Sequence, residues 1–164
     1  MIEFVQVSTI SAHCEEVWDR AVTPDGINYE LFPFMRMTVP KVLQGKSIHE
    51  VAIGTSIGRS WFLLFGFLPF DYDDITVAEL QHGHRFREKS SMFSIEDWEH
   101  ERTVTANGDN CDVCDRVRFV LRHRSFMMPL FGNCTAIMLR ALFAHRHRRL
   151  AKWFNNQKVQ RPRQ

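Results

Sequence analysis

The order of the predicted elements is the strongest constraint on the fold of this chain. Alternating apolar and polar residues predict a short strand at 2–9, and short helices are predicted at 11–21 and 24–31. Further strands are predicted at 50–57, 60–65, 74–80, 85–92, 95–106 and 111–123. A long helix is predicted from about 130 to 155, with one face formed by Leu139, Leu142, Phe143, Arg146, Leu150 and Trp153. This order favours an α+β fold in which an antiparallel meander accompanies one long C-terminal helix.

The length and composition favour a single domain. A chain of 164 residues, 45% of them hydrophobic, can bury its own core. We expect one ligand-binding domain over 1–157 and a disordered tail over 158–164. The first ten residues lack the features of a secretory signal, and the longest apolar run, 61–70, is about half as long as a spanning helix. These features predict a cytoplasmic protein.

Large apolar side chains occupy alternate turns of the predicted meander. The turns at 81–84 and 107–110 contain the Gly and Asn residues that tight hairpins favour. The segments at 66–70, 92–93 and 126–131 contain large apolar residues instead. Alternate turns share one end of a sheet, so the apolar turns are expected to lie together. They form either the rim of a cavity mouth or a closed lid over it. The rim would consist of Phe67, Leu68, Met92, Phe93, Phe126, Met127 and Phe131.

Three local strings are similar to those of a known superfamily. They are Val17-Trp18-Asp19, the run 98–102 (Trp-Glu-His-Glu-Arg) and residues 143–150. With the element order, they resemble the SRPBCC superfamily, which includes START lipid-transfer domains, pollen-allergen-like proteins and polyketide cyclases, and in particular a bacterial subgroup without an assigned reaction. The resemblance implies a helix-grip fold, in which a curved antiparallel sheet wraps around the long C-terminal helix and two short helices follow the first strand. It also implies a hydrophobic cavity, but no single chemistry.

The alternation of side chains along strands predicts a cluster of ionisable groups in the interior. Successive strand residues point to opposite faces of a sheet. Closing the hairpin through 107–110 places Arg102 opposite Asp115, so an inward-facing ion pair is expected. In the preceding strand, Glu88 is expected to lie inside, within a residue or two of His100. Four ionisable groups thus converge in an apolar interior.

Buried charges persist only where they satisfy one another or meet a ligand, because an unpaired buried charge is costly. One interpretation is a self-satisfied cluster in which Arg102 pairs with Asp115 and His100 with Glu88. Another is a polar anchor in an apolar pocket. A third makes His100 a general acid or base that is oriented by Glu88 or Asp115. The predicted ligand-binding residues are Phe86, Glu88, Trp98, His100, Arg102, Asp115, Val117, Phe119, Leu142 and Arg146. Arg146 is expected to reach inward to Glu88 or Asp115.

The charges are unevenly distributed along the chain. Residues 1–115 contain 9 Lys and Arg against 19 Asp and Glu, whereas 116–164 contain 12 Lys and Arg and no acid. Either the basic segment complements acidic strands beside it, or it forms a surface for anionic lipid or nucleic acid.

The four cysteines are expected to be reduced thiols. Cys111 and Cys114 have the spacing of a redox or zinc motif, but this spacing on a strand puts the two sulfurs on opposite faces. Cys14 and Cys134 are far away in sequence. We therefore expect neither a disulfide nor a metal site.

Together these features favour a non-catalytic binding protein. We expect a hydrophobic or amphipathic small molecule, or a lipid, to enter at the apolar end and be held by the buried polar cluster. The alternatives are a cyclase- or dehydratase-like enzyme that uses His100 with Glu88 or Asp115, and a peripheral membrane or protein-interaction module. We expect no cofactor and no nucleic-acid partner, and we expect transient contact with an anionic membrane.

Overall fold

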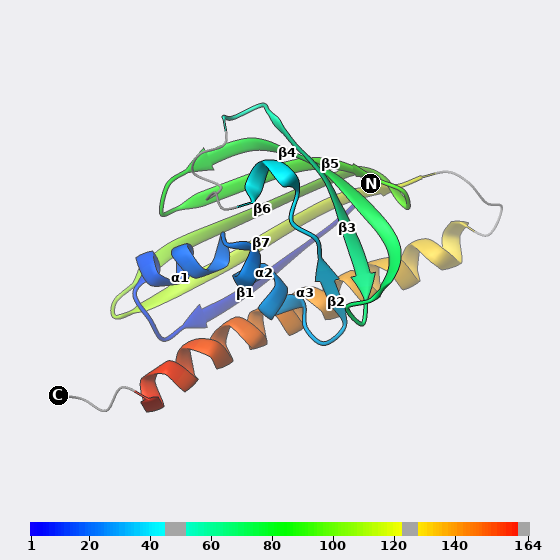
Figure 1. Cartoon of the computed structure of the whole chain (residues 1–164). Coiled ribbons are helices and arrows are strands. Elements are labelled where there is room, and N and C mark those ends of the chain that lie inside the picture. Colours follow the sequence, from blue (N-terminus) through cyan, green and yellow to red (C-terminus); the bar gives the residue numbers. More distant parts are fainter. Residues whose placement is uncertain (45–51, 123–127, 161–164) are drawn as a thin grey trace.

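A seven-stranded antiparallel sheet curls around a long C-terminal helix in the computed structural model, which describes residues 1–44, 52–122 and 128–160 (Figure 1). The strands are β1 (Ile2–Ile10), β2 (Met35–Met37), β3 (Ser56–Leu64), β4 (Leu68–Gln81), β5 (Arg85–Met92), β6 (Ile95–Asn107) and β7 (Asn110–Leu121). The helices are α1 (Cys14–Ala21), α2 (Pro24–Leu31), the short 3-10 helix η1 (Lys41–Leu43) and α3 (Met128–Gln160). The strand order is β1-β7-β6-β5-β4-β3-β2, so sequential strands from β2 to β7 are neighbours and β1 pairs with β7.

Most predicted elements are present, and the main difference is at β3. One strand runs there where two are expected from the sequence. Gly58 has a φ of 93° and lies at a shift in the β3–β4 register. The sequence predicts that the strand is interrupted near Gly58, but this glycine lies at an irregularity within one continuous strand. Residues 45–51 lie outside the described part, and so do 161–164, while α3 continues to Gln160 into the segment expected to be a tail.

The predicted pairing of the central strands is confirmed. Arg102 on β6 lies opposite Asp115 on β7, and Glu88 on β5 lies directly opposite His100. The polar turns at Gly83 and Gly108 both contain a glycine with positive φ, as a tight hairpin requires. Because the register is as expected, the four ionisable groups do point to the concave side of the sheet.

The core consists of two apolar clusters with a charged layer between them. The first cluster lies under α1 and includes Trp18 and Val113. The second lies towards the β5–β6 turn and includes Trp98, Phe119 and Phe143. The buried polar residues that separate them along β6, β7 and α3 are His100, Arg102, Asp115, Arg146 and His147. This layer crosses the middle of the domain.

The two short helices are fixed in place by close contacts. A Cβ at Gly26 would lie 1.8 Å from the carbonyl oxygen of Arg20, so only glycine allows α2 to approach α1 this closely. The Thr23 hydroxyl accepts a hydrogen bond from the Gly26 N–H and caps α2. The side-chain amide of Asn28 donates from Nδ2 to the Met37 carbonyl oxygen and accepts at Oδ1 from the Met37 N–H, which joins α2 to β2. These contacts hold α2 over the concave side of the sheet.

The expectation of four reduced thiols is wrong for two cysteines. Cys14 at the start of α1 and Cys111 on β7 form a disulfide, with Cα atoms 5.0 Å apart. The two residues are 97 positions apart in sequence, and only the packing of α1 against β7 brings them together. Cys114 and Cys134 are free, and Cys114 does not pair with Cys111, as the strand spacing predicts.

The convex face of the sheet contains a ladder of ion pairs. Arg118 on β7 pairs with Glu3 at 3.3 Å and with Glu99 at 3.7 Å. Glu99 also pairs with Arg87 on β5, which in turn pairs with Glu79 on β4. The basic residues of β7 therefore complement the acidic strands beside them, which confirms the first interpretation of the uneven charge for this strand. Among the described residues, no helix is long and apolar enough to cross a membrane.

Candidate functional site

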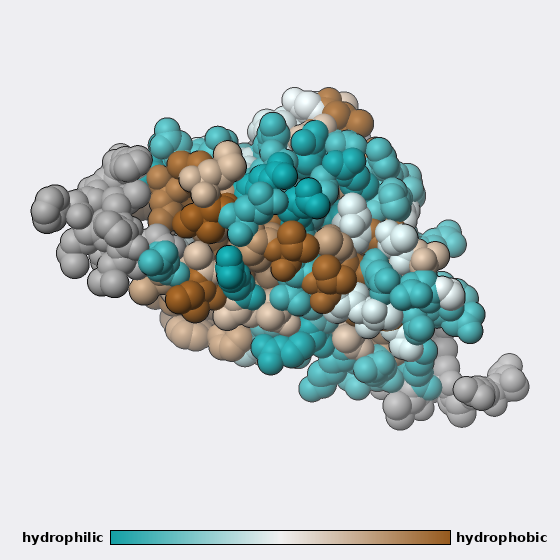
Figure 2. Space-filling model, turned by 180° about the vertical axis from the view of Figure 1, so that it is seen from behind, coloured by the Kyte–Doolittle hydropathy of each residue, from teal (hydrophilic) through white to brown (hydrophobic). Residues whose placement is uncertain are grey.

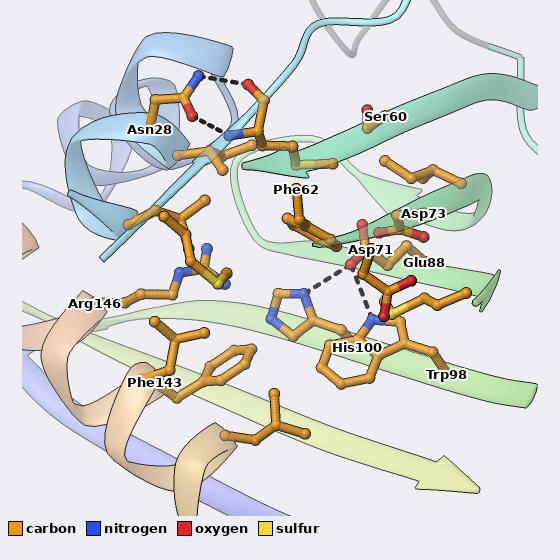
Figure 3. A pocket seen from close by; sticks show the side chains of 18 of the residues that line it. Asn28, Ser60, Phe62, Asp71, Asp73, Glu88, Trp98, His100, Phe143 and Arg146 are labelled. Atoms are coloured by element: carbon orange, nitrogen blue, oxygen red, sulfur yellow. Dashed lines mark hydrogen bonds and ion pairs between the residues drawn. The ribbon is translucent and has the colours of Figure 1, made fainter. Parts of the chain in front are cut away.

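A cavity of about 970 Å³ lies between the concave face of the sheet, α2 and α3 (Figure 3). Its wall is largely apolar and includes Leu31, Phe62, Ile75 and Leu142. Asn28, Thr38, His145 and Arg148 are among the polar residues that line it, and its buried polar side chains fall mainly into two groups. One belongs to the charged layer on β6 and α3, and the other lies on β3 and β4.

The charged layer is built around one buried arginine. Arg102 donates from Nε and Nη2 to Asp115, at 2.7 Å each, and from Nη1 and Nη2 to Glu30 on α2, at 2.9 and 3.1 Å. Arg146 on α3 also binds Glu30, through Nε at 3.0 Å. Burial lowers the pKa of Arg102, but the two carboxylates outweigh it and raise that pKa well above its usual value. Arg146 thus reaches inward as predicted, but its partner is Glu30 rather than Glu88 or Asp115.

His100 is held by carboxylates on both sides. Its Nδ1 is 3.2 Å from Oε1 of Glu88, and its Nε2 is 3.1 Å from Oδ1 of Asp115. Burial lowers the pKa of His100, but these two carboxylates outweigh it, so the pKa is raised above its usual value. Trp98 Nε1 donates to the same Glu88 oxygen at 3.3 Å. A protonated ring that donates from both nitrogens satisfies this geometry.

Asp115 is the most heavily bonded group of the layer. Its side chain is fully buried, and it accepts hydrogen bonds from Arg102, His100 and His147, the last through Nε2 at 3.0 Å. Burial raises the pKa of Asp115, but Arg102 and His100 outweigh it and hold the pKa well below its usual value. Asp115 therefore stays ionised.

Ser8, His147 and Asp115 form a hydrogen-bonded chain between β1, α3 and β7. The Ser8 hydroxyl lies 2.6 Å from His147 Nδ1. These residue types form hydrolase triads elsewhere, but here Asp115 already neutralises the guanidinium of Arg102. The chain joins α3 to the sheet.

The second polar group lies on the wall formed by β3 and β4. Ser60 and Asp73 are directly paired across these strands and both line the cavity. Ser60 is 0% exposed and Asp73 is 2% exposed, yet within the described residues Oγ of Ser60 and Oδ1 of Asp73 have no hydrogen-bond partner. Burial, then the nearby Glu88 carboxylate, raises the pKa of Asp73 well above its usual value, and the Ser90 hydroxyl opposes this rise.

Another buried acid, Asp71, has a structural role. Its Oδ1 accepts from the backbone N–H of Phe93 at 2.9 Å and of Tyr72 at 2.8 Å, and its Oδ2 accepts from the backbone and hydroxyl of Ser94. Asp71 therefore fixes the β5–β6 turn at the apolar end of the sheet.

The structure separates the predicted ligand-binding residues into two groups. Those that line the cavity are Phe86, Glu88, Trp98, His100, Arg102, Leu142 and Arg146. The three that do not line it are Asp115, Val117 and Phe119, which are buried in β7. Sequence reasoning missed five polar residues of the interior, which are Glu30, Ser60, Asp71, Asp73 and His147.

The described apolar turns do not close as a lid. Phe67 in the β3–β4 turn is 75% exposed and Phe93 in the β5–β6 turn is 54% exposed, and Leu68 is also exposed, whereas Met92 is buried and lines the cavity. Apolar residues gather towards this end of the molecule when it is seen from behind (Figure 2). The exposed large apolar residues that also line the cavity are Phe34, Phe65, Phe70, Phe93 and Met138. Of the remaining expected rim residues, Phe126 and Met127 lie outside the described residues, and of Phe131 only the helical backbone is described.

No set of residues in the described ranges is arranged for metal binding. The histidines and acids of the charged layer satisfy one another, and no group of three His, Cys, Asp or Glu side chains within these ranges could hold a metal ion.

Comparison with known proteins identifies the fold. A family model described as a domain of unknown function (DUF8410) matches residues 8–154, and no curated protein sequence matches. A solved structure from Chromobacterium violaceum is similar with a TM-score of 0.67 and 16% identity, covering 92% of this chain and 95% of that one. A START superfamily protein from Mycobacterium smegmatis has a TM-score of 0.63 and 8% identity, covering 92% and 98%. DynU16, a protein of the dynemicin biosynthetic locus, has a TM-score of 0.59 and 15% identity, covering 93% of this chain and 47% of that one. These likenesses show a START-type helix-grip fold, as expected from the sequence.

Proposed function

The chain belongs to the DUF8410 family, and from its fold and its cavity we propose that it binds and carries a hydrophobic or amphipathic small molecule. The observation that carries this proposal is the cavity itself. Its volume of about 970 Å³ is at the upper end of the range for small-molecule sites. An apolar wall with a few polar groups is also the usual composition of such sites.

The binding proposal can be tested by filling the cavity from α3. Leu142 lines the cavity, so Leu142→Trp adds side-chain volume inside it. Lys152→Trp is the matched control, because Lys152 is exposed on the same helix. We expect the wild type and the control to bind the neutral dye Nile red equally, and Leu142→Trp to bind it at least about tenfold more weakly, or by 1.4 kcal/mol. Thermal melts confirm that each variant is folded.

Two results would overturn the proposal. One is wild-type protein that neither binds the dye nor releases any small molecule in native mass spectrometry. The other is Leu142→Trp that is folded and binds the dye as the control does.

The geometry favours binding over catalysis by His100. A general base needs a free nitrogen within reach of the substrate, whereas both nitrogens of His100 face carboxylates at 3.1–3.2 Å. We therefore infer that His100 positions Glu88 at the cavity wall. His100→Gln should change Nile red affinity by only a few fold. A substrate that the wild type consumes at least about a hundredfold faster than this variant would favour the enzyme instead.

We further propose that the exposed apolar end lets the protein collect its ligand from a membrane surface. Phe65 has a φ of 52°, a backbone conformation that is unfavourable for a bulky residue, and its ring is exposed at the rim. Folding alone does not account for such a placement. Exposed apolar patches of this kind usually mark an interaction site, and here the patch borders the opening of the cavity.

Vesicle co-sedimentation tests this docking. We expect the wild type to bind vesicles of phosphatidylcholine with phosphatidylserine, and the pair Phe67→Ser with Phe93→Ser to bind several-fold less at unchanged thermal stability. The matched control is Val5→Ser with Val7→Ser, two exposed apolar residues on β1 that do not line the cavity. Equal sedimentation of the Phe67 and Phe93 variant and the wild type would refute membrane docking through these turns.

A further inference from the structure

The polar groups that line the cavity differ in whether they have a hydrogen-bond partner within the protein. Arg102 and Arg146 line the cavity, but both donate to Glu30, and Arg102 also donates to Asp115. Glu88 accepts from Trp98 and His100. In contrast, Oγ of Ser60 and Oδ1 of Asp73 have no partner within the described residues, although both side chains are buried. Buried polar atoms without partners are uncommon because each costs about 1–3 kcal/mol.

The two unpartnered atoms belong to neighbouring residues of the cavity wall. Ser60 and Asp73 are cross-strand neighbours on β3 and β4, and Figure 3 shows both on the wall above Glu88. A polar group of a bound molecule that reached this wall would meet both.

The surrounding charges determine what kind of polar group this wall accepts. Among the neighbouring charged groups, the Glu88 carboxylate raises the pKa of Asp73 most. The acids Asp71 and Asp74 raise that pKa as well. Of the cations that line the cavity, Arg102 is already paired with Glu30 and Asp115, and Arg146 with Glu30. A carboxylate on the ligand at this wall would therefore add a further acid to this group of acids, whereas Arg148, which also lines the cavity, is exposed on α3.

We propose that Ser60 and Asp73 form the head-group site of the cavity, and that they select an apolar molecule with one hydrogen-bond-donating group, an alcohol or an amine, over a fatty acid. This inference rests on the proposed function. An alcohol donates to Oδ1 of Asp73 and accepts from the Ser60 hydroxyl, and an amine donates to both. A site that hydrogen-bonds a donor rejects an analogue without one, because its buried polar atoms are then left unpaired.

The test uses three probes with the same alkyl chain, dodecanol, dodecylamine and dodecanoate, to displace Nile red from the whole protein below their micellar concentrations. For the wild type we expect the alcohol and the amine to displace the dye at concentrations at least about tenfold lower than dodecanoate, a discrimination of 1.4 kcal/mol. For Asp73→Asn and Ser60→Ala we expect this preference to fall below about threefold. Comparing the alcohol with the amine shows which donor is preferred.

Asp74→Asn is the matched control, because Asp74 is the next residue on β4 but points outward and pairs with Arg59 at 2.9 Å. It should keep the wild-type preference. The inference is overturned if dodecanoate binds the wild type as tightly as the other two probes, or if the preference persists in Asp73→Asn. In either case Nile red binding still supports the cavity as a ligand site, whereas absent dye binding would reject the proposed function as well.

Discussion

The stability losses from removing Arg102 and Asp115 should be far from additive, because the double variant should lose only about as much stability as either single variant. With His100 protonated, the buried layer contains three cations, Arg102, Arg146 and His100. They face three carboxylates, those of Glu30, Glu88 and Asp115. Arg102→Met leaves one negative charge in excess, and Asp115→Leu leaves one positive charge in excess. The double variant restores neutrality.

The partners that remain determine the magnitude. Removing one member of a buried ion pair typically costs about 3–5 kcal/mol, so two independent losses would add to about 6–10 kcal/mol. In the double variant Glu30 keeps Arg146, His100 keeps Glu88, and His147 keeps Ser8. No buried charge is then left without a partner. We expect the double variant to lose about as much stability as one single variant, a coupling of about 3–5 kcal/mol.

Urea denaturation of the wild type, both single variants and the double variant measures this coupling. The exposed pair Arg59–Asp74 provides a control cycle, in which the coupling should stay below about 1 kcal/mol. If a single variant does not fold, Asp115→Asn replaces Asp115→Leu and keeps the shape of the side chain. If the stability losses of the two single variants add up to the loss of the double variant within about 0.5 kcal/mol, the buried pair is refuted.

Three further outcomes are expected. Asp73→Asn should raise the free energy of unfolding at pH 7.5, commonly by about 0.5–2 kcal/mol for such a site, because burial and Glu88 raise the pKa of Asp73 in the folded state. Below its unfolded pKa of about 3.9, Asp73 is protonated in both the folded and the unfolded protein, so its ionisation lowers the free energy of unfolding only as the pH rises above that value. Urea titrations near pH 3.5 should therefore show little difference in stability between Asp73→Asn and the wild type. Under denaturing conditions a thiol reagent should count two free cysteines before reduction and four after it, given the Cys14–Cys111 disulfide; four before reduction would restore the expectation from sequence. Gly26→Ala should lower the free energy of unfolding by about 1–3 kcal/mol or more, because its Cβ would meet the carbonyl oxygen of Arg20.

The register of the central strands was predictable because two local rules agree there. The alternation of side chains along β6 and β7 defines their inward faces, and the Gly108 turn fixes how the two strands meet. Together they place Arg102 opposite Asp115 with one choice of turn. For β5 and β6 the alternation alone predicts Glu88 on the inward face within a residue or two of His100, and the structure pairs the two directly. Where pattern and turn chemistry both apply, pairs of residues could be predicted and not only strands.

Contacts between elements that are far apart in sequence could not be predicted in this way. Glu30 is the only acid on the buried face of α2, and nothing local indicates that it accepts from arginines 72 and 116 residues away. The Cys14–Cys111 disulfide depends in the same way on how α1 packs over β7. Both follow from the placement of helices on the sheet, which Gly26 and Asn28 determine through tertiary contacts.

Asp73 is a different case, because its inward position was readable and its role was not. Asp71, Asp73, Ile75 and Val77 alternate along β4, so the buried Ile75 and Val77 define the face on which both acids lie. The alternation does not tell which acid the protein satisfies. Asp71 accepts from backbone and hydroxyl groups of the β5–β6 turn, whereas Oδ1 of Asp73 has no partner within the described residues. Two acids on one face of one strand thus differ in their hydrogen bonding, and in the site that we propose a bound alcohol or amine would supply the hydrogen bond that Oδ1 of Asp73 lacks.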